Sequence, residues 1–236
     1  MNELHNIQNQ ILKKLMFSTG LKYTEMKPNK EMENNKFQFH LDKLTEQNYV
    51  EKDGDMYKLA DKGKHYIKCL DGVSGELVKP PHVSVRAACI RKVGNENEYL
   101  FYTRLKHPYY GGQGFPAGKL QHGEELGKAA IRELTEETGL TGEPKFAAIT
   151  HYLDMNKKGE CITDKLMFLF IVENPTGTLV NSEEGKYKWV KRSEVNSKIT
   201  KPFESMEGVY RELDLIDNYD GIIKFIEKAN EVEDLF

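Results

Sequence analysis

Residues 118–140 read GKLQHGEELGKAAIRELTEETGL, and this stretch constrains the fold of the chain more than any other. Apolar residues recur in it at helical spacing, so the pattern predicts an amphipathic helix from Leu126 to Thr138 that ends at Gly139. Glutamates at positions i, i+3 and i+4 of this helix share one face: Glu133, Glu136 and Glu137.

Carboxylates this close repel one another, so a helix gains nothing from the cluster unless a cation lies between them. A hard divalent ion suits them, because Mg²⁺ takes oxygen ligands, keeps several waters and bridges to phosphates. Such an ion lowers the pKa of a bound water and so supplies a nucleophile near neutral pH. Gly118 has no Cβ, so its backbone carbonyl can approach the same ion.

The stretch also fits the frame G-x5-E-x7-R-E-U-x-E-E-x-G-U, in which U is apolar. The residues at its defined positions are Gly118, Glu124, Arg132, Glu133, Leu134, Glu136, Glu137, Gly139 and Leu140. This frame resembles the Nudix box, the signature of Mg²⁺-dependent pyrophosphohydrolases that act on a nucleoside diphosphate linked to another group. The resemblance implies an α/β fold, with a mixed sheet inside an α/β/α sandwich.

The resemblance also implies roles for the residues of the box. Glu136 and Glu137 are expected to be the principal ligands of Mg²⁺, or of Mn²⁺ as a substitute, beside the carbonyl of Gly118. Glu133 is either a further ligand or the general base. Arg132 and Glu124 are expected to be structural, with the guanidinium holding a carboxylate and orienting the catalytic loop. Arg132, Glu133 and Glu137 are together the candidate catalytic residues.

Further candidate residues lie on both sides of the box. Glu183 or Glu184 is in the right place to add an acidic ligand, although both also suit a solvated loop. Arg104 is expected to hold a phosphate or ribose, and Tyr110 and Phe115 to stack a base, with plain packing as the alternative for these rings. The run Pro-Ala-Gly-Lys favours ADP-ribose-like substrates weakly over nucleoside triphosphates.

The sequence predicts a small domain over residues 1–72, a Gly- and Pro-rich linker over 73–82 and the Nudix domain over 83–236. The larger domain is expected to hold strands near 83–92, 99–104, 145–153, 165–172 and 187–190, and a closing helix near 220–231.

The first domain is predicted to hold helices over 7–15, 21–26, 35–48 and 61–70, with a hairpin over 49–60 around a turn at Gly54. An Asn cap is expected to begin the third helix. This order resembles a winged helix-turn-helix. If it binds DNA, the third helix lies in the major groove and presents Lys36, Gln38, His40 and Lys43, with Lys52 and Lys58 on the wing.

Residues 1–80 hold thirteen lysines and no arginine against twelve acidic residues, a weak basic excess for a DNA-binding face. The alternative is a domain that dimerises the chain or covers the enzyme, and a homodimer is compatible with either reading. The net charge of −3 calls for no membrane partner. The scattered Cys69, Cys89 and Cys161 and the lack of a signal-like N-terminus favour a cytoplasmic protein.

Two functions from different classes remain. The first is a pyrophosphohydrolase with an accessory N-terminal domain, and the second is a transcription regulator that senses a nucleotide and binds DNA. Regulators that only sense often lose carboxylates of the box, and this chain keeps all of them, which favours the enzyme. An isopentenyl-diphosphate isomerase-like activity is disfavoured, because the chain lacks a cysteine close to the box.

Overall fold

The computed structural model describes residues 4–232, which divide into two compact units at Pro80–Pro81. The division falls inside the segment that the sequence predicts to be a linker.

The N-terminal unit packs three helices against a three-stranded antiparallel sheet of order β1-β3-β2. Its elements are α1 (Asn6–Met16), β1 (Leu21–Lys22), α2 (Asn34–Glu46), β2 (Val50–Asp53), β3 (Met56–Leu59) and α3 (Asp61–Ile67). The core of this unit draws residues from all three helices, among them Ile11, Leu12, Phe37, Leu41, Leu44 and Tyr66.

The predicted hairpin is confirmed, with Gly54 in its turn at a φ of 61°. The predicted helix over 21–26 is wrong, because Leu21 and Lys22 form a strand that pairs with Tyr57 and Met56 of the hairpin. The Asn cap is also wrong: Glu33 precedes α2, and its side chain makes no capping hydrogen bond.

The C-terminal unit is built on one eight-stranded mixed sheet. The strands along its main path are β12 (Gly185–Lys191), β5 (Glu96–Arg104), β4 (His82–Val93), β10 (Cys161–Glu173), β9 (Pro144–Asn156) and β13 (Lys224–Val232). Strands β4 and β10 run parallel, as do β9 and β13, while β6 (Gln113–Gly114) and β7 (Ala117–Lys119) pair with β5 and β4. A separate two-stranded pair joins β8 (Leu140–Thr141) to β11 (Thr176–Gly177).

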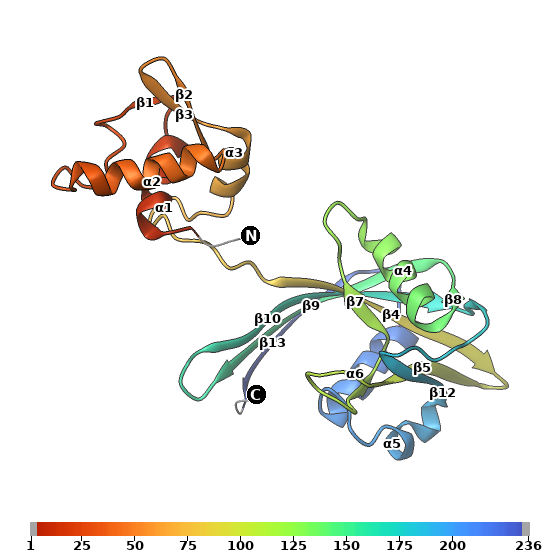
Figure 1. Cartoon of the computed structure of the whole chain (residues 1–236). Helices are drawn as coiled ribbons and strands as arrows, with labels where there is room; N and C mark the ends of the chain where they lie inside the picture. The colour runs from red at the N-terminus through yellow and green to blue at the C-terminus, as the bar shows by residue number, and fades with distance from the viewer. Residues whose placement is uncertain (1–3, 233–236) are drawn as a thin grey trace. The chain divides into compact units, whose positions relative to one another are not determined.

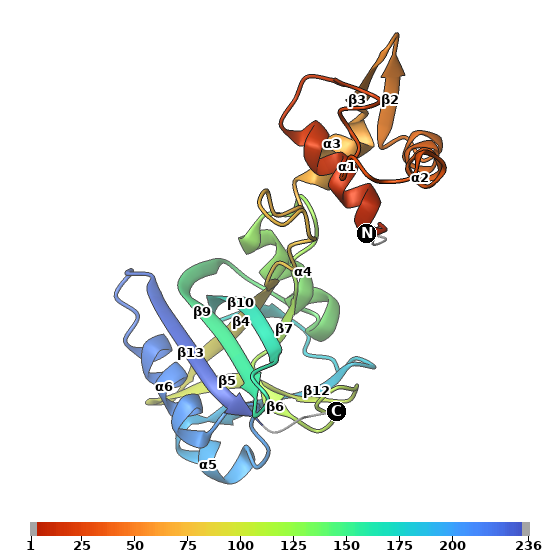
Figure 2. The ribbon, with the colours of Figure 1, turned by 90° about the vertical axis from the view of Figure 1, so that its left-hand side faces the viewer.

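A helix covers each face of this sheet (Figure 1 and Figure 2). Because side chains alternate along a strand, β4 sends Val85 and Ala87 to the face that α4 (Leu126–Thr138) covers. Its Ala88 faces the other way and packs in the core with α6 (Met206–Asp217). The short helices η1 (Arg192–Glu194) and α5 (Val195–Lys198) follow β12. The predicted α/β/α sandwich with a mixed sheet is confirmed.

The closing helix predicted over 220–231 is wrong, since this segment holds edge strand β13. Its apolar Ile222, Ile223 and Ile226 mimic helical spacing, but the strand alternates half-buried Ile226 with exposed neighbours. The helix of this layer comes earlier, as α6, which Ser205 caps by accepting a hydrogen bond from the Gly208 amide at 3.1 Å.

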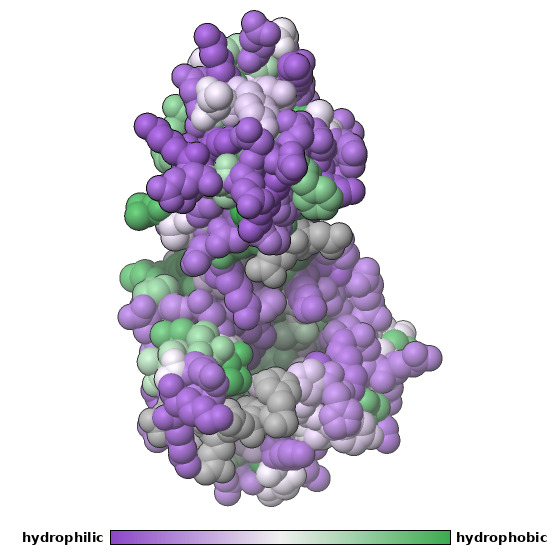
Figure 3. Space-filling model, turned by 60° about the vertical axis from the view of Figure 1, so that its left-hand side comes forward, coloured by the Kyte–Doolittle hydropathy of each residue, from purple (hydrophilic) through white to green (hydrophobic). Residues whose placement is uncertain are grey.

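The face of the molecule seen in Figure 3 is mostly hydrophilic, with smaller apolar patches. Among the described residues, no helix is long and apolar enough to cross a membrane.

Candidate active site

Helix α4 carries the carboxylates of the candidate site. Its Ala129, Ala130 and Leu134 are buried, which fixes the rotation of the helix against the sheet. Gly139 ends the helix in the left-handed conformation, with a φ of 71°. With the apolar face fixed in this way, the Glu133 side chain is 19% exposed and the Glu136 side chain is 61% exposed.

Arg132 links the loop before α4 to the carboxylates on the helix. Its Nε and Nη2 donate to the two carboxylate oxygens of Glu124 at 2.7 and 2.9 Å. Its Nη1 donates to Glu133 at 2.9 Å and to Glu136 at 3.1 Å, and Nη2 also donates to the carbonyl of Lys119 at 3.2 Å. The guanidinium holds the pKa of Glu124 below its usual value. One side chain therefore orients three of the glutamates together.

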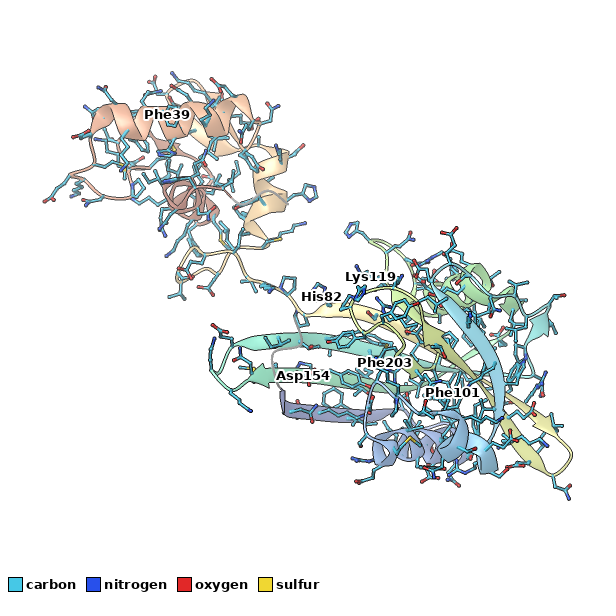
Figure 4. All side chains as sticks on the ribbon, turned by 60° about the horizontal axis from the view of Figure 1, so that its bottom comes forward. Phe39, His82, Phe101, Lys119, Asp154 and Phe203 are labelled. Carbon is cyan, nitrogen blue, oxygen red and sulfur yellow. The ribbon has the colours of Figure 1, made fainter. Side chains whose placement is uncertain are left out.

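Gly118 lies on β7, where it pairs with Val85 of β4. A Cβ built on Gly118 would lie only 1.9 Å from Cδ of Glu133, so this carboxylate occupies the space that a side chain would fill. Lys119 follows on the same strand and pairs with Ser84 near the start of β4 (Figure 4). The sheet thus presents the backbone of Gly118 to a carboxylate of α4.

Glu137 is partly buried and reaches β12. The Tyr187 hydroxyl donates to its Oε2 at 3.0 Å. Burial raises the pKa of Glu137, the hydrogen bond from Tyr187 lowers it, and the nearby charge of Glu133 raises it again. Burial is the largest of these effects, so the ionised form of Glu137 would gain from a cation bound beside it.

These residues fit a divalent cation by their chemistry. The cradle at Gly118 leaves room for a carboxylate where any other residue would place a Cβ, and the donors are carboxylate and carbonyl oxygens. Within residues 4–232, however, no three acidic, histidine or cysteine side chains are already gathered tightly enough to hold a metal. Arg132 holds two of the glutamates in this arrangement, at 2.9 and 3.1 Å.

The loop with Glu183 and Glu184 lies beside the segment that follows β5. The Leu105 amide donates to the Glu184 carbonyl at 2.8 Å, and the Glu184 carboxylate forms an ion pair with Lys106. Glu183 is exposed. Neither carboxylate has a contact with a glutamate of α4 among the described interactions, so the proposed extra ligand stays a prediction.

The three candidate substrate-binding residues lie in different settings. Arg104 donates to backbone carbonyls of its own loop, at 2.9 Å to Lys106 and 2.7 Å to Pro108. Tyr110 is 52% exposed and stacks on His107. Phe115 is only 3% exposed and stacks on Phe101 in the core, with ring centroids 4.8 Å apart. The role of Phe115 as a free stacking surface is therefore wrong, because its ring serves the core.

Sequence reasoning missed Tyr187 and a buried charged cluster on the α6 side of β4. Arg86 donates to both carboxylate oxygens of Glu212 at 2.7 and 2.9 Å, and its Nε has no partner in the described part of the chain. Burial, and then the charges of Arg86, Arg104 and Lys119, lower the pKa of Lys165 to about 8. A single arginine in the apolar strand VSVRAACI was a readable signal, whereas Tyr187 had none.

In the N-terminal unit, the structure separates the candidate DNA-binding residues of α2. Lys36 and Gln38 are exposed and Lys43 is half-buried. His40 is 8% exposed and stacks on His5, so its predicted outward position is wrong. The reason was readable in the sequence: Phe37, His40, Leu41 and Leu44 occupy positions i, i+3, i+4 and i+7, which form one helix face. Of the wing residues, Lys58 forms an ion pair with Asp53, and Lys52 lies over the Tyr57 ring.

Comparison with known proteins gives a consistent result. The family model of the NUDIX domain matches residues 80–213, which is more than half of the chain. The uncharacterized Nudix hydrolase YvcI of Bacillus subtilis is 32% identical over 87 residues, 36% of this chain and 54% of that protein. The chain thus spans about half the length of this curated relative.

Solved structures with a similar fold include the MutT protein of Bacillus halodurans, with a TM-score of 0.51 and 20% identity over 64% of this chain and 90% of that one. The NUDIX domain of Shewanella oneidensis NrtR, complexed with ADP ribose, has a TM-score of 0.50 and 15% identity over 64% and 96% of the two chains. The box on α4, the mixed sheet and the matching family model together make this chain a member of the Nudix hydrolase family.

Proposed function

We propose that the C-terminal unit hydrolyses a phosphoric anhydride bond in a nucleoside diphosphate linked to another group. The observation that carries this proposal is the contact of Gly118 with Glu133, since a catalytic carboxylate fills the place of a missing Cβ. The family adds the reaction class, because Nudix hydrolases act on bonds of the pyrophosphate type.

Four groups would hold a Mg²⁺ ion, or Mn²⁺ in its place: the Gly118 carbonyl and the carboxylates of Glu133, Glu136 and Glu137. When bound, the ion would neutralise the diphosphate and lower the pKa of a coordinated water. A cation would also relieve the repulsion among these glutamates and the cost of burying the charge of Glu137.

The protein's own side chains prepare the site around these oxygens. Arg132 keeps Glu124, Glu133 and Glu136 oriented through charge-assisted hydrogen bonds, and Tyr187 orients Glu137. Glu133 acts either as a ligand or as the base that takes a proton from the attacking water. Arg104 and Lys106 lie close enough to influence the charge of Glu137, and we assign them to the phosphates of the substrate.

The test is divalent-cation-dependent hydrolysis of a substrate panel: ADP-ribose, NADH, dinucleoside polyphosphates, a sugar nucleotide, and normal and oxidised nucleoside triphosphates. ADP-ribose-like compounds and nucleoside triphosphates remain the two substrate classes that we propose. We expect one class to be cleaved well. Glu137→Gln should lower kcat by about 10²- to 10⁴-fold with the fold intact, because it removes a charge that the cation requires.

Glu125→Gln is the matched control, because Glu125 directly precedes α4, is highly exposed and pairs with the exposed Lys128. This variant should keep the activity of the unaltered protein. Full turnover by a folded Glu137→Gln protein would refute the assigned site. Failure to cleave any compound, with nucleotide binding retained, would favour a sensor.

A second candidate function is that of a nucleotide-responsive regulator, and the element order of the N-terminal unit favours it. Helix α2 precedes the β2–β3 hairpin and α3 follows it, and we propose that residues 1–72 form a winged helix. The exposed side of α2 carries acidic Asp42 and Glu46 beside its lysines, however. Gln38 donates to Asp42 at 2.6 Å, so one candidate base-reading amide is already engaged.

DNA binding can be tested by selecting sequences from a random duplex library at low and at physiological salt. A specific operator should lose affinity when Lys36→Met is introduced, because Lys36 is exposed on α2. Binding that shows no sequence preference and vanishes at physiological salt would leave the N-terminal unit without a DNA-reading role.

A further inference from the structure

A ligand-sized hollow lies in the N-terminal unit, against one side of α2. Its volume is about 620 Å³, which is in the range of small-molecule pockets. The side chains that define its character are His5, Phe39, His40, Lys43, Tyr49 and Lys62. The matched NUDIX domain begins at residue 80, so the catalytic family assigns no role to this hollow.

The hollow is electropositive. No aspartate or glutamate of the described chain lines it, while Lys43 and Lys62 do. Lys62 donates to the Gln47 carbonyl at 3.1 Å and lies 4.2 Å above the Tyr49 ring, contacts that leave its charge uncancelled. Lys43 pairs with Glu46 at 3.5 Å, but both side chains are too exposed for a strong interaction. The walls therefore attract an anion.

Two imidazoles add hydrogen-bonding capacity. The rings of His5 and His40 stack with centroids 4.5 Å apart. Nδ1 of His5 accepts from the Ile7 amide at 3.1 Å, so the neutral ring carries its proton on Nε2. His40 is 8% exposed, lines the hollow and contacts the rings of His5 and Phe39. Because an imidazole can both donate and accept a hydrogen bond, the two rings that line the hollow offer polar contacts to a ligand.

An aromatic surface completes the site. Phe39 is 58% exposed on α2 (Figure 4), and it meets the edge of the His40 ring at a centroid distance of 5.3 Å. A planar heterocycle can stack on an exposed aromatic ring at the wall of a hollow. The Gln47 amide at the margin offers both a donor and an acceptor for the edge of a base.

We propose that this hollow binds a small ligand that joins a planar aromatic ring to a phosphate, of the nucleoside monophosphate class. The cations and imidazoles hold the phosphate, and Phe39 stacks the ring. This site shares no residue with the carboxylate site of α4. The proposal therefore does not depend on the proposed function.

Three probes separate the two halves of the ligand: AMP has the ring, the sugar and the phosphate, adenosine lacks the phosphate, and ribose 5-phosphate lacks the ring. Binding to the full chain is measured by calorimetry in EDTA, so that no divalent cation can hold phosphate at the catalytic site. AMP should bind at least about tenfold more tightly than either part. Equal binding of AMP and ribose 5-phosphate would overturn the stacking role of Phe39.

Matched lysine variants locate the binding. Lys43→Met and Lys62→Met should each weaken AMP about tenfold, because each removes a charge-assisted contact. Lys52→Met on β2 and Lys64→Met on α3 are the controls, since neither lysine lines the hollow. AMP should also shift the NMR signals of the His5 and His40 rings, which His5→Gln and His40→Gln assign.

The proposal is wrong if the four lysine variants bind AMP equally, or if the signals of both histidines stay unchanged at saturating AMP. Unchanged hydrolysis kinetics in Lys43→Met and Lys62→Met would show that the catalytic site is intact, so that any loss of AMP binding belongs to the N-terminal unit.

Discussion

At the scale of single residues, the glycine at position 118 says most about how the candidate site is built. Gly118 carries no chemistry of its own, but its empty Cβ position is filled by the Glu133 carboxylate. The sequence predicts that Gly118 allows a close approach, because the position requires a residue without Cβ. It does not identify Glu133 as the neighbour, since that depends on how β7 and α4 pack.

Gly118→Ala is expected to lower kcat/KM by about 10²-fold, because the new methyl group displaces Glu133 and small displacements in an active site have effects of this size. The fold should survive, since the displaced atoms belong to a flexible side chain. Steady-state kinetics and a thermal unfolding curve measure both effects. In the control Gly127→Ala, the added Cβ lies 3.5 Å from its nearest neighbour, and Ala is the better helix former. Equal activity of the two variants would contradict the assigned role.

His40 provides a second prediction at the residue scale. Burial, followed by the charges of His5 and Lys36, lowers the pKa of His40 below its ordinary value of 6.5. The folded chain therefore favours neutral His40, while the unfolded chain binds a proton below pH 6.5. The free energy of unfolding is therefore highest above the pKa that His40 has in the unfolded chain. It decreases as the pH falls from there toward the pKa of the folded chain.

An NMR titration of the ligand-free protein should give His40 a pKa below 6.5. The signals of His107, which lies in the C-terminal unit, serve as the control. Between pH 6.5 and the folded pKa of His40, the free energy of unfolding should fall less steeply with decreasing pH in the His40→Gln variant than in the unaltered protein. A His40 pKa at or above 6.5 would contradict the buried, unprotonated state.

At the scale of helices and strands, the sequence predicts those elements whose apolar residues recur with a clear helical or strand period. The helix over Leu126–Thr138 begins and ends at the predicted residues, because its apolar spacing and Gly139 act together. The long strands β4, β5, β9, β10 and β12 were also readable from alternation and apolar runs, whereas the short strands β6 and β7 were not predicted. Strand β13 was not, because it forms only by pairing with β9, and α6 was missed although Ser205 and its apolar spacing signal it. The Glu137–Tyr187 contact joins residues fifty positions apart, so no local pattern could reveal it.

The end of α4 can be tested with two glycines of similar φ. Gly139 has a φ of 71°, and a Cβ there would lie 2.6 Å from the Thr178 carbonyl. Gly159 has a φ of 78° and no neighbour within 4 Å. Both alanine variants pay the left-handed backbone cost of roughly 1–2 kcal/mol, but Gly139→Ala adds about 1–3 kcal/mol from the steric clash. Chemical denaturation should therefore give Gly139→Ala a clearly lower free energy of unfolding than Gly159→Ala. Equal free energies would mean that the loop at Thr178 moves away from the added methyl group at no cost.

For the whole molecule, the organisation into two compact units has a functional consequence. Each unit has its own hydrophobic core, and the proposed catalytic residues all come from the C-terminal unit. The proposed ligand site of the N-terminal unit is likewise built within that unit. We therefore infer that catalysis needs only residues 81–236, and that the N-terminal unit adds recognition or regulation.

Deleting residues 1–80 tests this inference. The deletion ends just before β4, which begins at His82 and pairs with β10 from His82 to Ile90, so the sheet keeps every strand. The shortened protein should stay soluble and keep the kcat/KM of the full chain for the substrate that the panel identifies, because no residue of the α4 site is lost. A longer deletion, of residues 1–93, removes β4 from between β5 and β10 and should abolish folding. A well-folded 81–236 protein that has lost activity would show instead that the N-terminal unit takes part in the catalytic site.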